Sequence, residues 1–136
     1  MPHEDGSAYH PVVATVSLGG SLVLDVTEKV DHSTSANTDA DGATSARKSW
    51  RILQEPRSLL ITSGSAYTDT LHGIAEVKED VDLNASNVAN WDLLDDREVI
   101  EANGGKNERT TRISLTYRDV LKVSKVGSKI FGKQRT

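Results

Sequence analysis

The sequence predicts a mainly β protein, a sandwich or roll of short antiparallel strands joined by long loops. Three observations support this prediction: apolar and polar residues alternate over several short runs, β-branched residues are frequent in these runs, and glycine or proline separates neighbouring runs. The chain has 136 residues, of which 36% are hydrophobic and 26% are charged. This composition is that of one globular domain.

The first two predicted strands are "VVATVSL" (Val12–Leu18) and "SLVLDV" (Ser21–Val26). Both alternate with period two, and Gly19-Gly20 lies between them. Two glycines between alternating runs are typical of a tight hairpin. We therefore expect these two strands to be paired neighbours.

The next two predicted strands, "KSWRILQ" (48–54) and "RSLLITS" (57–63), flank Glu55-Pro56. Proline has no N–H for a strand ladder, so we expect a corner there rather than a continuous strand. The last predicted strand is "TRISLTYRDV" (111–120), which has the clearest alternation in the chain.

Two segments do not have a strand pattern. Residues 28–48 are small and polar, which predicts a loop. Residues 78–109 form an acidic, Asn-rich insertion in which "NWDLLDDREVIEANGG" predicts one short helix, with Asn90 as its N-terminal cap and Asn103-Gly104 as its end.

The charge distribution restricts the expected partners only weakly. There are 16 Lys and Arg residues against 20 Asp and Glu residues. Residues 119–136 form a basic tail, which could contact phosphate. Its simpler interpretation is a solvated chain end, because no aromatic run accompanies it.

The composition also excludes several kinds of site and location. The chain has no cysteine, so disulfides and thiolate metal sites are excluded. It has neither an apolar run of membrane-spanning length nor a signal-peptide pattern at its start. We expect an intracellular protein, cytoplasmic or nuclear, with no membrane partner.

The start of the chain, "MPHEDGSAYHP", carries two potential metal ligands. His3 and Asp5 are two residues apart, so on an extended segment their side chains leave the same face. One more imidazole would complete the two-His, one-carboxylate triad of non-haem iron enzymes. An ordinary surface dipeptide gives the same pattern, so the pair alone does not identify a site.

Three histidines could supply the third ligand. His10 is close to the pair, His32 lies in the polar loop, and His72 precedes a glycine that allows close backbone approach. We take His72, because a roll of strands can bring residues 5 and 72 together. A histidine with a purely structural role beside a strand remains the alternative.

The late strand carries polar residues at every second position. These are Arg112, Ser114, Thr116 and Arg118. They share one face of the strand, which either contacts water or lines a confined space. In a confined space, two guanidinium groups need anions, and a small dicarboxylate such as 2-oxoglutarate meets this need because arginine pairs with carboxylate through two hydrogen bonds.

Five motifs together resemble the AlkB-type Fe(II)/2-oxoglutarate dioxygenases, most closely the subgroup of AlkB homologue six. They are "HEDG", "PVVATVSLG", "LQEPRSLLI", "AYTDTLHGI" and "RISLTYR", in this order from His3 to Arg118. The resemblance implies a double-stranded β-helix, or jelly roll, with one short helix in an insertion. It also implies an Fe(II)- and 2-oxoglutarate-dependent oxidative demethylase or hydroxylase that releases succinate and CO2, with alkylated nucleic acid as the expected substrate.

Carried over residue by residue, the resemblance assigns the site. It implies that His3, Asp5 and His72 hold Fe(II). Arg112, Ser114 and Arg118 would bind 2-oxoglutarate, and no catalytic side chain is implied beyond the metal ligands.

The sequence departs from the family pattern at three places. Ser7 replaces an acidic residue that contacts the base in many relatives, and Ser114 replaces an asparagine between the two arginines. Family members also carry a substantial region before the metal pair, whereas this chain starts at Met1. We therefore expect residues 1–136 to be the C-terminal portion of one dioxygenase domain. The alternative function is an inactive fragment, or a β-roll that binds a partner or nucleic acid.

Overall fold

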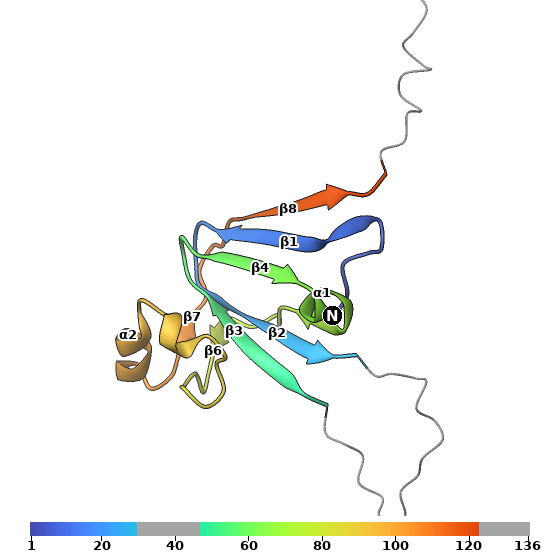
Figure 1. The fold of residues 1–136 in the computed structure, drawn as a ribbon. Coiled ribbons are helices and arrows are strands. Elements are labelled where there is room, and N and C mark those ends of the chain that lie inside the picture. The colour runs from blue at the N-terminus through green and yellow to red at the C-terminus, as the bar shows by residue number, and fades with distance from the viewer. Residues whose placement is uncertain (30–46, 123–136) are drawn as a thin grey trace, which may run out of the picture.

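The computed structural model describes residues 1–29 and 47–122, and their fold consists mainly of two three-stranded antiparallel sheets (Figure 1). The first sheet has the order β4 (Leu59–Ser63), β1 (Tyr9–Ser17), β8 (Ser114–Val120). The second has the order β3 (Ser49–Gln54), β2 (Leu22–Glu28), β5 (Thr70–Gly73). The mainly β, jelly-roll-like fold predicted from the sequence is thus confirmed.

The hairpin predicted at Gly19-Gly20 is wrong, because β1 and β2 belong to different sheets. The two glycines instead let the chain pass from one sheet to the other in close contact with residues 110–113, which lead into β8. Gly20 has a φ of +32°, and a Cβ placed on it would lie 3.0 Å from the carbonyl oxygens of Thr110 and Thr111. Glycine is needed here for a close backbone approach rather than for a two-residue turn.

The corner predicted at Glu55-Pro56 is confirmed, because the chain also changes sheets between β3 and β4. The corner is fixed to the end of β1 by backbone hydrogen bonds. The N–H of Arg57 donates to the oxygen of Ser17 (2.7 Å), and the N–H of Ser17 donates to the oxygen of Ser58 (2.9 Å). A short helix that the sequence did not predict, α1 (Ser65–Thr68), then leads from β4 to β5.

The acidic insertion forms a small unit of its own, closed by the pairing of β6 (Glu79–Asp80) with β7 (Asn107–Glu108). The single predicted helix is divided into a 3-10 turn, η1 (Trp91–Leu93), and the helix α2 (Arg97–Ala102). Its predicted end is correct, since Asn103 caps α2 and Gly104 has a φ of +67°. Asn90 makes no side-chain cap bond and instead binds β3, as its amide donates to the oxygen of Leu53 (2.8 Å) and accepts from its N–H (3.0 Å).

The main hydrophobic core lies between this insertion and the outer side of the β3–β2–β5 sheet. It consists of Val23, Leu53, Leu83, Val88, Trp91, Leu94 and Ile100. The neighbouring strand residues, Leu24 and Ile52, point to the opposite side, into the space between the two sheets. The core therefore covers one side of this sheet and leaves the other side free to line a cavity.

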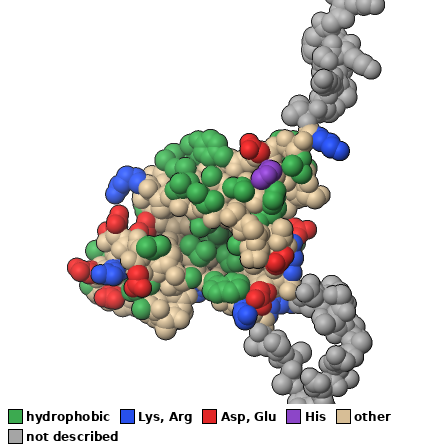
Figure 2. Space-filling view, in the orientation of Figure 1, with side chains coloured by type: hydrophobic (Ala, Val, Ile, Leu, Met, Phe, Trp, Pro, Cys, Tyr) green, Lys and Arg blue, Asp and Glu red, His purple; other side chains and the backbone are tan. Residues whose placement is uncertain are grey.

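The outer side of the β4–β1–β8 sheet is apolar and exposed. Its side chains, between 41% and 60% exposed, are Val12, Leu59, Ile113, Leu115 and Tyr117. The strand register places Leu59 and Leu115 on either side of Val16. We call these five residues the outer apolar face. Figure 2 shows hydrophobic side chains gathered over the upper part of the molecule, near β1 and β8, and in the hollow below.

Two predicted features fall partly outside the described residues. Most of the polar loop 28–48 and most of the basic tail 119–136 lie there. In the part of the chain that the structure describes, no helix is long and apolar enough to cross a bilayer.

Candidate metal and dicarboxylate site

The first turn of the chain lies against β5 and brings His3 next to His72. The backbone N–H of each residue donates to the carbonyl oxygen of the other, both at 2.9 Å. Their ring centroids are 4.6 Å apart. Gly73 makes this approach possible, because a Cβ at this position would lie 3.2 Å from the Cα of Pro2.

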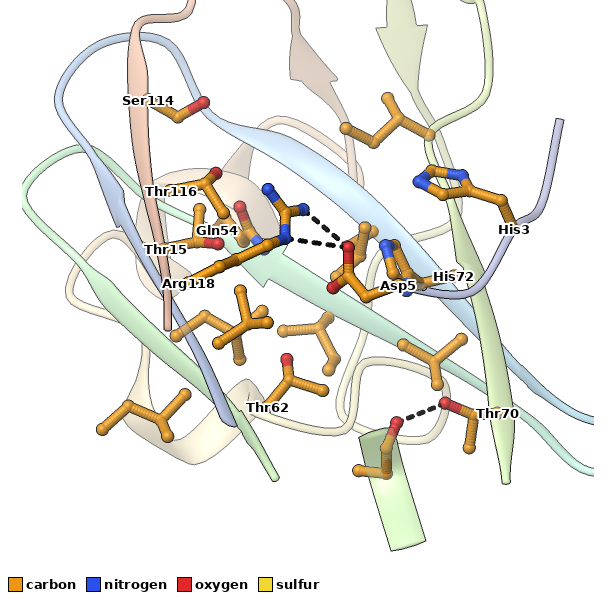
Figure 3. Close-up of a pocket in the computed structure, with 18 of the residues that line it drawn as sticks. His3, Asp5, Thr15, Gln54, Thr62, Thr70, His72, Ser114, Thr116 and Arg118 are labelled. Carbon is orange, nitrogen blue, oxygen red and sulfur yellow. Dashed lines mark hydrogen bonds and ion pairs between the residues drawn. The ribbon is translucent and has the colours of Figure 1, made fainter. Parts of the chain in front are cut away.

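Asp5 lies in the same cavity and is held by Arg118 of β8 (Figure 3). The Oδ1 atom of Asp5 accepts a hydrogen bond from Nε of Arg118 (2.9 Å) and forms an ion pair with Nη2 of the same arginine (2.7 Å). The side chain of Asp5 is only 10% exposed. Arg118 also lies over the ring of Tyr9, with its guanidinium carbon 5.7 Å from the ring centroid. The ion pair therefore fixes the carboxylate near the two imidazoles.

The three ligands taken from the sequence thus line one cavity of about 310 Å³ between the sheets. Of the other histidines considered, His10 is exposed on β1 and is not part of this lining. His32 lies outside the described residues. The structure therefore brings together His3, Asp5 and His72, and leaves His10 apart.

The environment of His72 favours the neutral imidazole. Burial lowers the pKa of His72, and the neighbouring His3 and Arg118 also lower it, whereas Asp5 acts in the opposite direction. Removal of a proton leaves a ring nitrogen with a free lone pair, which is the form that binds a metal.

The donor chemistry fits an intermediate divalent metal, since two imidazoles and one carboxylate form a facial triad. Within residues 1–29 and 47–122, no three His, Cys, Asp or Glu side chains are already arranged as a closed ligand set. The ion pair with Arg118 engages the Oδ1 atom of Asp5.

The other end of the cavity contains a partly buried cation. The guanidinium of Arg112 donates to Ser114 Oγ (2.8 Å), Ser17 Oγ (3.1 Å) and Gln54 Oε1 (2.5 Å). All of these partners are neutral, and its Nε is buried without a partner. Burial lowers the pKa of Arg112 because the charged form loses hydration. A guanidinium without an acidic partner is the kind of group that pairs with an anion.

The polar residues at every second position from Arg112 to Arg118 lie on one side of β8 and of the segment before it. All four polar residues of that face line the cavity: Arg112, Ser114, Thr116 and Arg118. This face therefore borders a cavity, although Thr116 and Arg118 remain exposed.

Sequence reasoning did not find Ser17 and Gln54, which hold the Arg112 guanidinium. Both side chains are buried, at 1% and 4% exposure. Their signal in the sequence is weak: each is one polar residue at the end of an apolar strand, where a solvent-exposed turn usually begins. The two residues lie on different sheets and meet only through the packing of those sheets, where Ser17 Oγ donates to Gln54 Oε1 (3.4 Å).

No protein-family model matches the chain. A curated protein does match and supports the resemblance to AlkB-type proteins that the motifs indicated. The match is 37% identical over 129 residues, and it covers 90% of this chain and 48% of the matching protein. That protein is the "Probable RNA/DNA demethylase ALKBH6" of Danio rerio. The chain therefore spans about half the length of this relative.

Proposed function

We propose that this chain carries the metal- and cosubstrate-binding part of an Fe(II)- and 2-oxoglutarate-dependent dioxygenase of the AlkB type. One observation carries the proposal: a single cavity is lined by two imidazoles, a carboxylate and two guanidinium groups. These are the groups that a ferrous ion and a dicarboxylate need together.

In this proposal, His3, Asp5 and His72 hold Fe(II), which supplies the activation of oxygen when it is bound. The protein keeps both imidazoles in contact through the backbone bridge between residues 3 and 72. Arg118 orients the carboxylate of Asp5 and adds a positive charge at the metal end of the cavity. These side chains act by binding and positioning.

The same proposal assigns 2-oxoglutarate to the Arg112 end. The guanidinium binds the carboxylate of the cosubstrate that lies far from the metal, and Ser114 adds a hydroxyl donor. Ser17 and Gln54 keep the guanidinium in place. The ion pair so formed would satisfy the charge that lies, partly buried, among neutral groups in the free chain.

The expected reaction is oxidative demethylation or hydroxylation, with succinate and CO2 as co-products. Alkylated nucleic acid is the proposed substrate class, in line with the name of the relative. A second candidate function is an inactive, partner-binding β-roll. The outer apolar face supports this second function, because exposed apolar surface of this kind often marks a protein interface.

The test is formation of succinate from 2-oxoglutarate in the presence of Fe(II). We expect His72→Ala to abolish turnover and to weaken Fe(II) binding, measured anaerobically by calorimetry, by at least about tenfold. His10→Ala is the matched control, since His10 is exposed and outside the cavity, and it should leave both measurements unchanged. Equal turnover in the His72→Ala variant would reject the proposal.

A further inference from the structure

The turn that carries Asp5 makes few backbone contacts with the sheets. Residues 4–7 belong to no strand, and the backbone bridge that holds His3 ends just before them. His3 and Asp5 line the cavity, whereas Glu4 and Gly6, which flank Asp5 in the chain, do not. The place of the Asp5 carboxylate therefore depends on contacts made by side chains.

The two flanking residues are held from the side of α1, beside which the start of the chain lies (Figure 1). The phenol of Tyr67 donates to the carbonyl oxygen of Gly6 (3.2 Å). Lys29 forms an ion pair with Glu4, and its ammonium group also donates to the carbonyl oxygen of Thr68 (2.5 Å). The turn is thus held both before and after the carboxylate that points into the cavity.

The helix α1 is itself fixed in place, although it has only one turn. The hydroxyl of Thr70, a buried residue of β5, donates to the carbonyl oxygen of Ala66 (2.6 Å). The N–H of Asp69 donates to the oxygen of Ser65, and the N–H of Lys29 donates to the oxygen of Asp69, both at 2.8 Å. The helix is therefore joined to β5 and to the residue that follows β2.

We propose that Tyr67 and Lys29 hold the turn of Asp5 in place, as positioning residues for the candidate metal site. They act through Gly6 and Glu4, and they keep the Asp5 carboxylate beside the two imidazoles before a metal binds. This inference rests on the proposed function for the identity of the metal ligands. A ligand that is already in place loses less conformational freedom on binding, so the metal binds more tightly.

These contacts are too exposed to contribute much to the stability of the whole fold. The side chains of Lys29 and Glu4 are 30% and 56% exposed, and water weakens an ion pair of this kind. The hydrogen bond of Tyr67 is also exposed. Loss of either contact should change the Tm by less than about 3 °C. A positioning role therefore differs measurably from a general structural role.

The experiment uses the whole chain and two measurements. The first is the heteronuclear NOE of the backbone amides in the metal-free chain, which reports fast local motion. We expect Tyr67→Phe and Lys29→Met each to lower the NOE of residues 4–6 and to leave that of β1 and β2 unchanged. The second is calorimetric titration with Co²⁺, a redox-stable divalent metal, which each variant should bind about fivefold more weakly than the wild-type chain.

Tyr117→Phe and Lys106→Met are the matched controls. Tyr117 is exposed on β8 and does not line the cavity, and Lys106 pairs with Glu79 in the insertion (3.4 Å). Neither variant should change the NOE of the turn or the affinity for Co²⁺. Lys29→Arg should keep most of the affinity, because a guanidinium can donate to both partners of the ammonium group.

Two results would overturn the inference: Co²⁺ affinity equal to that of the wild-type chain in both variants, or a loss of affinity accompanied by a fall in Tm of more than about 5 °C. Failure of the wild-type chain to bind Co²⁺ has a different meaning. Together with a lower NOE confined to residues 4–6 of the variants, it would reject the metal site of the proposed function and support the holding of the turn by Tyr67 and Lys29.

Discussion

At the scale of single residues, Arg112 is the most informative side chain of the cavity. Its guanidinium is partly buried among hydroxyl and amide oxygens, and within the described chain no carboxylate lies within ion-pair distance of it. A partly buried charge without an acidic partner loses part of its hydration and gains no ion pair, so binding of an anion there is favourable. Arg118 differs from it, because Asp5 already satisfies its charge.

This difference predicts the behaviour of Arg112→Met. The substitution removes a charge that lacks an acidic partner, so we expect an unchanged or higher Tm in the absence of ligand. We also expect the variant to lose the increase in Tm that 2-oxoglutarate produces in the wild-type chain. Thermal unfolding followed by circular dichroism measures both effects.

The control for this prediction is Arg97→Met, an exposed arginine of α2. Its response to 2-oxoglutarate should equal that of the wild-type chain. A Tm increase with 2-oxoglutarate that persists in Arg112→Met would show that the cosubstrate does not bind at this end of the cavity.

The arginines could be recognised from the sequence because a strand places every second side chain on one face, which is a local rule. Ser17 and Gln54 could not be recognised in this way. They meet Arg112 only because the chain changes sheets at Gly19-Gly20 and again at Pro56. Contacts of this kind depend on the arrangement of distant segments, which local pattern does not contain.

At the scale of elements, the insertion depends on one buried ion pair at its base. Asp80 accepts hydrogen bonds from Arg109 (2.5 and 3.0 Å) and from Asn107 (3.0 Å), and the two charged side chains are 3% and 12% exposed. These hydrogen bonds raise the pKa of Arg109. The pair joins β6 to the residues at and after β7, and so closes the unit that supplies most of the core.

We predict that Asp80→Ala lowers the free energy of unfolding by about 3 kcal/mol, because it leaves the guanidinium of Arg109 buried without its partner. Urea denaturation measures the change. The neighbouring exposed pair Glu79–Lys106, at 3.4 Å, provides the control. Glu79→Gln should cost less than about 0.5 kcal/mol. Similar losses in the two variants would contradict the assignment of stability to the buried pair.

The elements were predicted correctly where the alternation of apolar residues or a proline decides the local structure. The prediction failed where a contact with a residue distant in the sequence decides it. The strands and the proline corner follow from alternation and from the missing N–H of proline. The helix predicted from Asn90 to Asn103 is divided because the Asn90 side chain binds the edge of β3 instead of capping a helix. Its competing partner, the backbone of Leu53, lies 37 residues away in the sequence.

At the scale of the whole molecule, the two sheets differ in how they are covered. The insertion packs on the outer side of β3–β2–β5, whereas the outer apolar face of β4–β1–β8 is exposed. The chain spans about half the length of its curated relative. An exposed apolar sheet face tends to associate with other apolar surface.

We therefore predict that the double variant Leu59→Lys with Leu115→Lys reduces self-association of the chain. Both residues flank Val16 on the outer apolar face and neither lines the cavity. Light scattering after size exclusion should give a lower apparent mass at high protein concentration. Leu93→Lys, an 82% exposed position on the insertion, is the control and should change the mass little. A double variant that associates as strongly as the wild-type chain would contradict this role for the face.

The position of the hydrophobic core behind β3–β2 has a consequence for how such a protein can diversify. The side chains of the hydrophobic core belong to one side of this sheet, and those that line the cavity belong to the other. Exchanges such as Ile52 for valine or Thr70 for serine could thus alter ligand preference while the packing around Trp91 stays intact. Along a single strand, the core-facing positions and the cavity-facing positions can therefore mutate independently. The first set affects stability, and the second set affects binding.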